Sequence, residues 1–207
     1  MVVQVVLGNL PVKIIVAYGP QENAPKEKKD MFWEFLEEEA NKAELEDQGL
    51  IIHMDGNLHA GPEFIKDDPN CQNTNGKIYT NGKRFMEFLE MNPFLTVGNK
   101  LDICQGTITR QRELKNKSEK AILDFFIMNE KLRPFLTRIL IDEEREFCLS
   151  NFAQVKKNRR VVETDHNTMV ADFDISVPER KPERVELFNL RNKECQEKFT
   201  RETEDCS

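Results

Sequence analysis

The residues best suited to chemistry in this sequence are acids, an amide and a histidine that lie in or beside short apolar runs. In chain order they are Asp55, Asn57, Asp124, Asp165 and His166. Short apolar runs predict strands, and strands that are far apart in the sequence can bring such side chains to one place. The pattern therefore predicts one catalytic pocket, and metal-assisted hydrolysis of a phosphoester is one chemistry that it supports.

Asp124 is the acid whose surroundings are hardest to explain without a function. Ile, Leu and Phe residues flank it on both sides, and burial of an unpaired carboxylate is costly. Of the three histidines, His166 stands beside another acid, so we expect it to be the partner of Asp124. Such a pair fixes the imidazole tautomer and favours its charged form. Asp165 would then be available for a cation that polarises a phosphate.

Asp55 and Asn57 lie two residues apart, directly after the apolar run 50–54. In an extended backbone, side chains two apart face the same side of the strand. The pair is therefore expected to share one ligand, such as a water or a phosphate oxygen near a hard cation. The Asp55-Gly56 dipeptide also fits an ordinary turn, and the sequence leaves that alternative open.

The predicted elements are helices and strands that interleave along the chain. Two β-branched runs, 2–7 and 12–18, predict a hairpin. Residues 26–47 carry apolar side chains at intervals of three and four, which predicts an amphipathic helix that packs on a sheet, although its Glu-rich face also suits a partner. Further strands are predicted at 50–54, 94–97, 107–109, 121–128, 138–141 and 168–175, with a helix at 83–90 after a polar loop over 61–82. Together they indicate an α/β or α+β domain.

Length and charge limit the organisation of the chain. Its 207 residues suffice for one domain and a short appendage, and we place the domain at 1–177 and a charged helical tail or linker at 178–207.

The net charge of −7 excludes binding of nucleic acid over the whole surface. A local DNA contact is predicted at a basic cluster, for which an ordinary solvated loop is an equal alternative. The cluster consists of Lys156, Lys157, Arg159 and Arg160.

Cysteine usage and hydropathy bear on the compartment. The five cysteines form no CxxC pair and no even-numbered framework, which is typical of reduced thiols in a nuclear or cytoplasmic protein. No apolar run approaches the roughly 20 residues of a membrane helix. The apolar start, 1–7, is too short for a secretory signal and has no cationic leader. We therefore expect an intracellular protein that is neither secreted nor attached to a membrane.

Four segments resemble, in order, the motifs of the endonuclease/exonuclease/phosphatase superfamily, and most closely those of LINE-type retrotransposon endonuclease domains. Residues 14–20 resemble the strand that ends in Tyr-x-Pro, 54–61 resemble Gly-Asp-Phe-Asn-x-His, 123–127 resemble the Ile-Asp-Tyr-Ile strand, and 164–167 resemble the closing Ser-Asp-His. The resemblance covers roughly 2–175. It implies a layered α/β sandwich of the pancreatic deoxyribonuclease type, with the site at one edge.

The resemblance also implies a role for each matched residue. The family tyrosine, here Tyr18, contacts the phosphate, and the residues that match Asp55 and Asn57 position the attacking water and the scissile group. The strand aspartate orients the closing histidine, as in the pair described above. The aspartate next to that histidine, here Asp165, contributes to the metal site. The resemblance thus implies Mg²⁺ or Mn²⁺ as cofactor and nucleic acid, DNA in particular, as partner.

The sequence departs from the family pattern at its start. Domains of this family begin with a segment that carries an Asn and a strand that carries a metal-binding Glu, but no acidic residue precedes Tyr18 here. We therefore expect a domain that is incomplete at its N-terminus and binds Mg²⁺ weakly or not at all. Gly56 replaces an aromatic residue, which predicts a looser backbone around Asp55. We also expect a partly exposed apolar sheet face that associates with a partner.

The most specific functional expectation is a truncated, metal-dependent phosphodiesterase-like domain of retroelement origin that hydrolyses nucleic-acid phosphodiesters when completed. One alternative is a non-catalytic remnant or interaction domain that binds through the helix 26–47 and the exposed sheet face. Another is a phosphatase of the same fold, for which the sequence contains no selecting motif. Nicking of DNA that depends on His166 separates the first reading from the interaction domain.

Overall fold

The computed structural model describes residues 1–61, 78–114, 117–147 and 164–175, all within one compact unit, Met1–Ile175. The basic cluster of Lys156, Lys157, Arg159 and Arg160 lies outside the described residues, as does the segment 178–207. Their predicted roles, as a DNA contact and as a tail or linker, stay predictions. Within the part of the chain that is described, none of the helices is long and apolar enough to cross a membrane.

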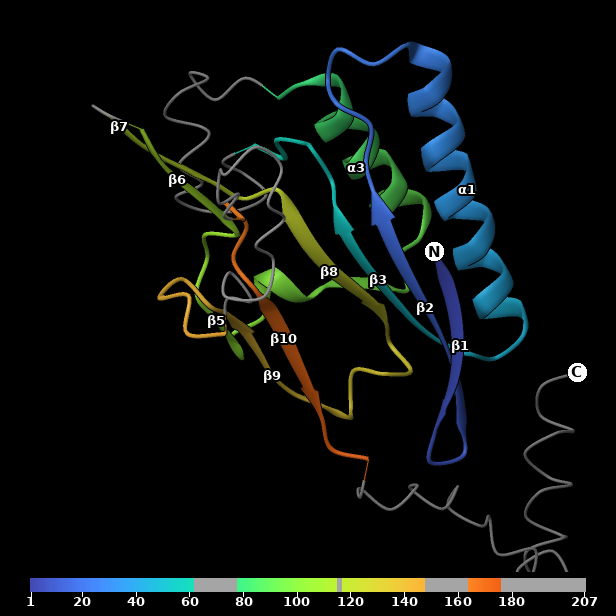
Figure 1. Cartoon of the computed structure of the whole chain (residues 1–207). Coiled ribbons are helices and arrows are strands. Elements are labelled where there is room, and N and C mark those ends of the chain that lie inside the picture. Colours follow the sequence, from blue (N-terminus) through green and yellow to red (C-terminus); the bar gives the residue numbers. More distant parts are fainter. Residues whose placement is uncertain (62–77, 115–116, 148–163, 176–207) are drawn as a thin grey trace, which may run out of the picture. The chain divides into compact units, whose positions relative to one another are not determined.

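A five-stranded sheet forms the centre of this unit (Figure 1). Its strands, in spatial order, are β1 (Val2–Leu7), β2 (Leu10–Tyr18), β3 (Gly49–Asp55), β8 (Asp124–Asn129) and β4 (Leu95–Val97). Strands β2 and β3 are parallel, and the other neighbours are antiparallel. The predicted hairpin is confirmed, and Gly8 at φ 62° makes its turn, a conformation that glycine adopts without strain.

Two helices, α1 (Lys26–Leu45) and α3 (Thr80–Met91), cover one face of the sheet (Figure 1). Helix α1 buries side chains spaced by three and four residues, including Trp33, Leu36 and Ala40. They pack against strand residues such as Ile15 and Ile52, which are fully buried. The predicted amphipathic helix is therefore confirmed, and its apolar stripe stabilises the domain by removing these side chains from water.

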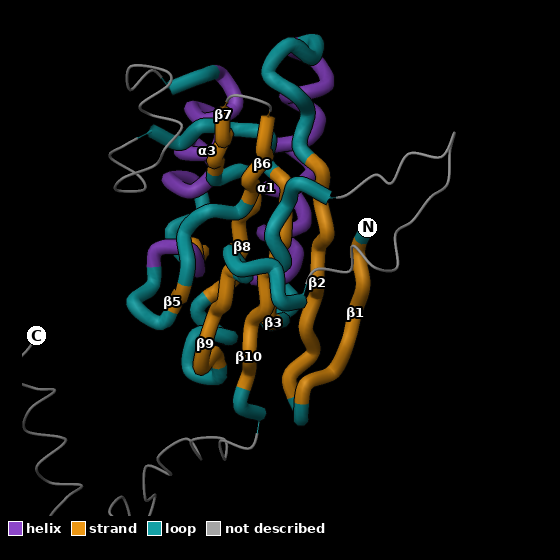
Figure 2. Tube along the Cα trace, turned by 60° about the vertical axis from the view of Figure 1, so that its left-hand side comes forward, coloured by secondary structure: helices purple, strands orange, loops and turns teal. Residues whose placement is uncertain are grey.

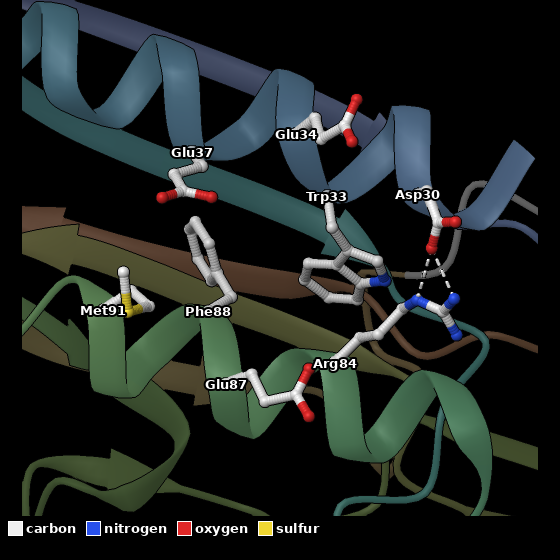
Figure 3. Close-up of a pocket in the computed structure, with 8 residues that line it drawn as sticks. All are labelled: Asp30, Trp33, Glu34, Glu37, Arg84, Glu87, Phe88 and Met91. Atoms are coloured by element: carbon white, nitrogen blue, oxygen red, sulfur yellow. Dashed lines mark hydrogen bonds and ion pairs between the residues drawn. The ribbon is translucent and has the colours of Figure 1, made fainter. Parts of the chain in front are cut away.

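The two helices also contact each other through aromatic and charged side chains (Figure 3). The ring centroids of Trp33 and Phe88 are 5.7 Å apart, and Arg84 donates hydrogen bonds to Asp30 from both Nε and Nη2. Both aromatic side chains are buried. Trp33 therefore belongs to the core, as expected for a helix that packs on a sheet.

A second sheet packs on the opposite face of the central sheet (Figure 2). It consists of β10 (Met169–Phe173), β9 (Leu136–Ile141) and β5 (Cys104–Gln105). The apolar interface between the two sheets includes Phe126, Met128, Leu136 and Ile139, all buried. A 3₁₀ turn, η1 (Gly98–Lys100), follows β4, and a hairpin of β6 (Arg110–Leu114) and β7 (Lys117–Ala121) precedes β8. The helix–sheet–sheet layers confirm the predicted α/β sandwich.

Part of the face that β1 and β2 turn away from the helices is exposed. Along β2, Ile15 faces the helices, so Val16 points to the other side, where it is 42% exposed. On β1, Val3 pairs with Ile14 on the same side and is 39% exposed. These side chains agree with the expectation of a partly exposed apolar sheet face. The association with a partner stays a prediction.

The strand predicted at 107–109 is wrong. The backbone N–H groups of Thr107 and Ile108 donate to the side chain of Glu143 instead of to a neighbouring strand. Regular pairing begins only at Arg110. A side chain that is distant in the sequence thus replaces the ladder that the β-branched residues predict.

The single strand predicted over 121–128 is divided in two. Strand β7 ends at Ala121 and β8 begins at Asp124. The break allows the chain to leave the short hairpin and enter the central sheet. It also places Asp124 at a strand end, where its side chain is only partly buried.

The helix predicted at 83–90 begins earlier, at Thr80, inside the predicted loop 61–82. The carboxylate of Glu22 accepts hydrogen bonds from the N–H groups of Thr80 and Asn81. Free N–H groups at a helix start need such acceptors. A carboxylate from the segment between β2 and α1 therefore determines where α3 begins.

Candidate active site

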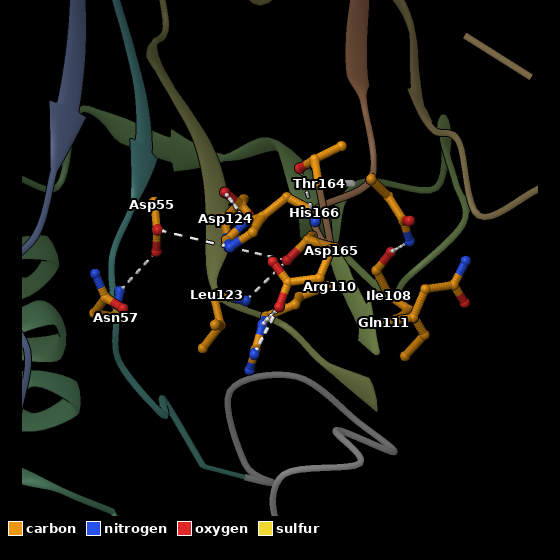
Figure 4. Close-up of polar contacts among 12 residues, drawn as sticks. Asp55, Asn57, Ile108, Arg110, Gln111, Leu123, Asp124, Thr164, Asp165 and His166 are labelled. Carbon is orange, nitrogen blue, oxygen red and sulfur yellow. Dashed lines mark hydrogen bonds and ion pairs between the residues drawn. The ribbon is translucent and has the colours of Figure 1, made fainter. Parts of the chain in front are cut away.

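Two strand ends and the segment before β10 bring Asp55, Asp124 and His166 together (Figure 4). Asp55, at the end of β3, is the register partner of Asp124, at the start of β8. The Nδ1 atom of His166 lies 2.9 Å from Oδ2 and 3.2 Å from Oδ1 of Asp124. The contact predicted between Asp124 and His166 is therefore present, and its catalytic role stays a prediction.

Asp55 faces the other ring nitrogen of the histidine. Its Oδ2 lies 3.9 Å from Nε2 of His166, so the imidazole stands between two carboxylates. The side chains of Asp55, Asp124 and His166 are 16%, 14% and 32% exposed. In such a partly buried place, two carboxylates repel each other strongly unless a cation lies close to both. The charged form of the histidine is one such cation.

The electrostatics of the site shift two pKa values upward. Burial, followed by the charge of Asp124, raises the pKa of Asp55 above its ordinary value, and the opposing hydrogen bond from Asn57 and nearby positive charges do not cancel this effect. The pKa of His166 is raised chiefly by its hydrogen bond to Asp124, against the effect of burial and with help from the nearby carboxylates. The site therefore favours a charged imidazolium beside a carboxylate of increased basicity.

Two side chains without a predicted role hold the start of β8 in place. Thr109 is fully buried, and its Oγ1 accepts hydrogen bonds from the N–H groups of Leu123 at 2.8 Å and Asp124 at 3.0 Å. Asn99 donates from Nδ2 to the carbonyl of Asp124 and accepts from the N–H of Phe126. Neither residue carries a sequence signal of this role, because the contacts with Asp124 span 15 and 25 residues.

The segment that carries His166 is fixed against β6. Arg110 and His166 form an antiparallel bridge, and the N–H of Gln111 donates to the carbonyl of Asp165 at 2.8 Å. Arg145, at φ 60°, donates from Nη2 to the carbonyls of Gln111 and Asp165. Arg145 is thus a positioning residue for the closing motif. It lies outside every matched motif, so the sequence does not reveal this role.

Asp165, the predicted metal ligand, has an arginine partner. The Nε and Nη2 atoms of Arg110 each lie 2.7 Å from Oδ2 of Asp165. Burial acts to raise the pKa of Asp165, but the hydrogen bond and charge of Arg110 outweigh it, so the pKa lies below its ordinary value. Among the described residues, the side chains close enough to share an ion are Asp55, Asp124 and His166. The metal-ligand role of Asp165 stays a prediction.

Asn57 and Tyr18 lie beside Asp55, but the side chain of Asn57 binds elsewhere and that of Tyr18 is exposed to solvent. The backbone at Asn57 has φ 44°, so the extended conformation that would point Asp55 and Asn57 to one ligand is not present. Asn57 instead donates from Nδ2 to the carbonyl of Gly19 at 2.9 Å and from its N–H to Oδ1 of Asp55 at 3.2 Å. Tyr18 is the register partner of Asp55 and is 68% exposed. Its contact with a phosphate stays a prediction.

The backbone around Asp55 is held on both sides, contrary to the looser backbone expected from Gly56. The N–H of Gly56 donates to the carbonyl of Leu123 at 2.7 Å, and the N–H of Gly19 donates to the carbonyl of Asp55 at 2.6 Å. A Cβ on Gly19 would lie 2.6 Å from the carbonyl oxygen of Gly56. This close approach therefore requires glycine at position 19.

Comparison with known proteins gives likenesses in structure only. No family model matches the chain, and no curated protein matches it significantly. The endonuclease domain of TRAS1, a telomere-specific non-LTR retrotransposon, is similar with a TM-score of 0.50 and 15% identity over 84% of this chain and 62% of that one. The 3′-5′ exonuclease NExo from Neisseria meningitidis has a TM-score of 0.54 at 17% identity, over 84% of this chain and 64% of that one.

A further structure, of the 3′ phosphatase NExo from Neisseria bound to a product DNA hairpin, has a TM-score of 0.55 at 17% identity with the same coverage. The chain spans 62% to 64% of the length of these structures. At this level of identity the likeness concerns the fold. With the two packed sheets and the covering helices, it shows that this chain shares its α/β fold with these nuclease and phosphatase structures.

Proposed function

We propose that this chain is part of a metal-dependent phosphodiesterase domain that cuts nucleic acid when the domain is complete. The observation that carries the proposal is the 2.9 Å contact between Asp124 and Nδ1 of His166, with Asp55 facing Nε2. One carboxylate holds the imidazole, and the other stands beside the nitrogen that remains to meet a substrate. The nuclease and phosphatase structures of the same fold support this class of reaction.

In the proposed reaction a water molecule attacks phosphorus, the bond between phosphorus and one ester oxygen breaks, and that oxygen leaves and takes up a proton from solvent. Asp55, which faces Nε2 of His166, is placed to accept the proton of that water. The imidazolium of His166 donates from Nε2 to a phosphoryl oxygen and stabilises the charge that develops there. Asp124 keeps the ring in this orientation. Tyr18 contacts the phosphate, while Asn57 holds the turn after Tyr18 next to the site.

The residues of the site fit a divalent cation. Asp55, Asp124 and His166 offer ligand atoms that all lie within 4.8 Å of one another. Carboxylate oxygens are the ligands that Mg²⁺ and Mn²⁺ prefer. The cation, when bound, polarises the phosphate and neutralises negative charge. We assign its binding to Asp55 and Asp124, with Asp165 as an additional ligand.

A plasmid-nicking assay tests the proposal. The chain joined to a segment that supplies the family's Asn and metal-binding Glu is expected, with Mg²⁺ or Mn²⁺, to convert supercoiled DNA to the nicked form. His166→Ala in the same protein is expected to abolish the conversion. Arg138→Gln is a suitable control, because Arg138 pairs with Asp172 between β9 and β10 and outside the site. Equal nicking by the completed wild type and its His166→Ala variant, or none by the completed wild type, would contradict the proposal.

We also propose a retroelement origin and an additional segment that supplies the family's Asn and metal-binding Glu. The likeness to the TRAS1 endonuclease domain supports the retroelement origin. The match covers only 62% of that domain, which supports the existence of the additional segment. The gene is expected to encode such strands in frame before Met1. A gene without them, together with a full chain that nicks DNA, would contradict the need for a further segment.

A 3′ phosphatase is the second candidate, because one of the similar structures is described as a 3′ phosphatase with a product DNA hairpin. The two candidates differ in the bond that breaks. A DNA oligonucleotide with a 3′-phosphate releases inorganic phosphate under a phosphatase and is shortened or nicked by a phosphodiesterase. Release of phosphate without any cut of an internal bond would favour the phosphatase.

A further inference from the structure

Among the described residues of the site, Arg110 is a cation that none of the roles above uses. Its guanidinium lies beside Asp165 with 26% of the side chain exposed, against 37% for the carboxylate (Figure 4). Both Nε and Nη2 converge on Oδ2 of Asp165 at 2.7 Å. Charge-assisted hydrogen bonds of this length are strong, and they occupy the oxygen that they reach.

The pairing of the two backbones positions the arginine. Arg110 and His166 form a β-bridge, and hydrogen bonds from Gln111 and Arg145 hold the carbonyl of Asp165 on the same segment. Cross-strand neighbours of opposite charge meet with little loss of side-chain freedom. The contact between Arg110 and Asp165 is therefore built into the fold and is not an incidental surface ion pair.

The charges next to Asp165 leave little place for a second strong cation while Arg110 contacts this carboxylate. Three carboxylates, those of Asp55, Asp124 and Asp165, stand near the guanidinium of Arg110 and the imidazole of His166, whose charged form is favoured. A divalent ion that used Asp165 would face the guanidinium across a few ångströms, where like charges repel even in a water-rich site. The ion and Arg110 cannot both contact the same carboxylate oxygen.

We propose that Arg110 is an internal counter-ion that competes with a divalent cation for Asp165, so that the full metal site forms only when this contact opens. The inference deepens the proposed function and rests on it for the place of the ion. Substrate phosphates are the groups that can release Arg110, because a guanidinium binds phosphate oxygens as well as it binds a carboxylate.

Binding of Mn²⁺ alone to the full chain, followed by electron paramagnetic resonance without substrate, tests the proposal. Arg110→Gln is expected to bind Mn²⁺ at least about tenfold more tightly than wild type, because a repelling charge is removed. Arg138→Gln is the matched control, since Arg138 also places Nε and Nη2 on one oxygen of Asp172, at 2.8 Å and 2.7 Å, outside the site. It is expected to match wild type.

Two further variants separate competition from a general change of charge. Arg110→Gln combined with Asp165→Asn is expected to lose the gain. In the chain that keeps Arg110, Asp165→Asn is expected to change Mn²⁺ affinity less than about threefold, because Arg110 already contacts Oδ2 of this carboxylate and opposes its charge. Asp165→Asn replaces a carboxylate that is 37% exposed by an amide of the same size, so this variant is expected to fold. It therefore gives a result even where Arg110→Gln does not fold.

An unchanged affinity in folded Arg110→Gln, an equal gain in Arg138→Gln, or a tenfold loss in Asp165→Asn alone would each overturn the proposal. The measurement uses no substrate, so a chain that does not nick DNA can still show the competition. Nicking that depends on His166, combined with an unchanged affinity in Arg110→Gln, would overturn this inference and leave the proposed function standing.

Discussion

The Nδ1 atom of His166 lies 2.9 Å from Oδ2 of Asp124, a contact between residues that are 42 positions apart. The carboxylate makes the charged imidazole favourable and leaves Nε2 on the side of Asp55. One hydrogen bond thus sets the charge, the tautomer and the direction of the ring. The predictions below follow from this pair and from the groups that hold it.

Asp124→Asn keeps the shape of the side chain and removes its charge. The pKa of His166 is expected to fall towards its ordinary value of 6.5, because the hydrogen bond that the imidazole donates to the carboxylate is the first cause of its elevation. NMR titration of the imidazole signal measures this directly. Nicking is expected to fall at least about a hundredfold. Asp102→Asn, at an exposed position, removes the same charge and should leave the titration unchanged.

The stability of the fold is expected to depend on pH through His166. Its pKa is 6.5 in an unfolded chain and higher in the folded one, so the stabilisation by the imidazolium is fully present below pH 6.5. It is lost as the pH rises through the folded pKa. Urea unfolding of wild type and His166→Asn should therefore show a difference in free energy that shrinks as the pH rises above 6.5. A constant difference would refute the ion pair as its source.

Asp55→Asn is expected to stabilise the protein at neutral pH. The folded pKa of Asp55 is raised above 3.8, so the charged carboxylate is less favourable in the folded chain than in the unfolded one. That cost begins to decrease as the pH falls through the raised folded pKa, and it is gone below the unfolded value of 3.8, where Asp55 is protonated in both states. Thermal unfolding should give a higher Tm for Asp55→Asn at pH 7, and the two curves should converge in acid. Nicking is expected to be lost, because active-site charges commonly reduce stability while they are needed for activity.

Thr109→Val is expected to destabilise the fold and to disturb the site. It removes the oxygen that accepts the N–H groups of Leu123 and Asp124 inside a fully buried position. Each buried N–H left without an acceptor costs about 1–3 kcal/mol. Thr109→Ser keeps the hydroxyl and should retain most of the unfolding free energy. Equal losses in the two variants would show that the methyl group, and not the hydrogen bonds, accounts for the effect.

The exposed face of β1 and β2 is expected to mediate association. Val16→Glu places a charge on this face at a side chain that is already 42% exposed, so the unfolding free energy should change by less than about 0.5 kcal/mol. Sedimentation of wild type should show association that weakens in Val16→Glu. Leu45→Glu, at an exposed position at the end of α1, is the control. A wild type that sediments as a monomer would contradict this prediction.

Local patterns were enough to predict most elements of the fold. The hairpin of β1 and β2 follows from two β-branched runs around a glycine turn, and α1 follows from its three-and-four spacing. The predictions fail where a side chain that is distant in the sequence accepts a hydrogen bond from a backbone N–H group. Glu143 replaces a strand at 107–109, and Glu22 moves the start of α3 to Thr80.

The residues of the candidate site could also be predicted from the sequence only in part. Asp55, Asp124 and His166 stand out in the sequence, because a carboxylate or imidazole next to an apolar strand is costly unless it is paired or used. Thr109, Asn99 and Arg145 do not stand out, since an isolated polar residue in a loop or a single 3₁₀ turn carries no pattern that indicates its partner.

By itself, the sequence determined the local elements, the residue types of the site and the resemblance to a nuclease family, because periodicity and short motifs are properties of neighbouring residues. Only the tertiary structure decided that Asn57 turns away to Gly19 and that Asp165 is occupied by Arg110. These contacts depend on the distance and angle between segments that meet only when the sheets pack. Charge balance in the site is therefore a property of the folded chain.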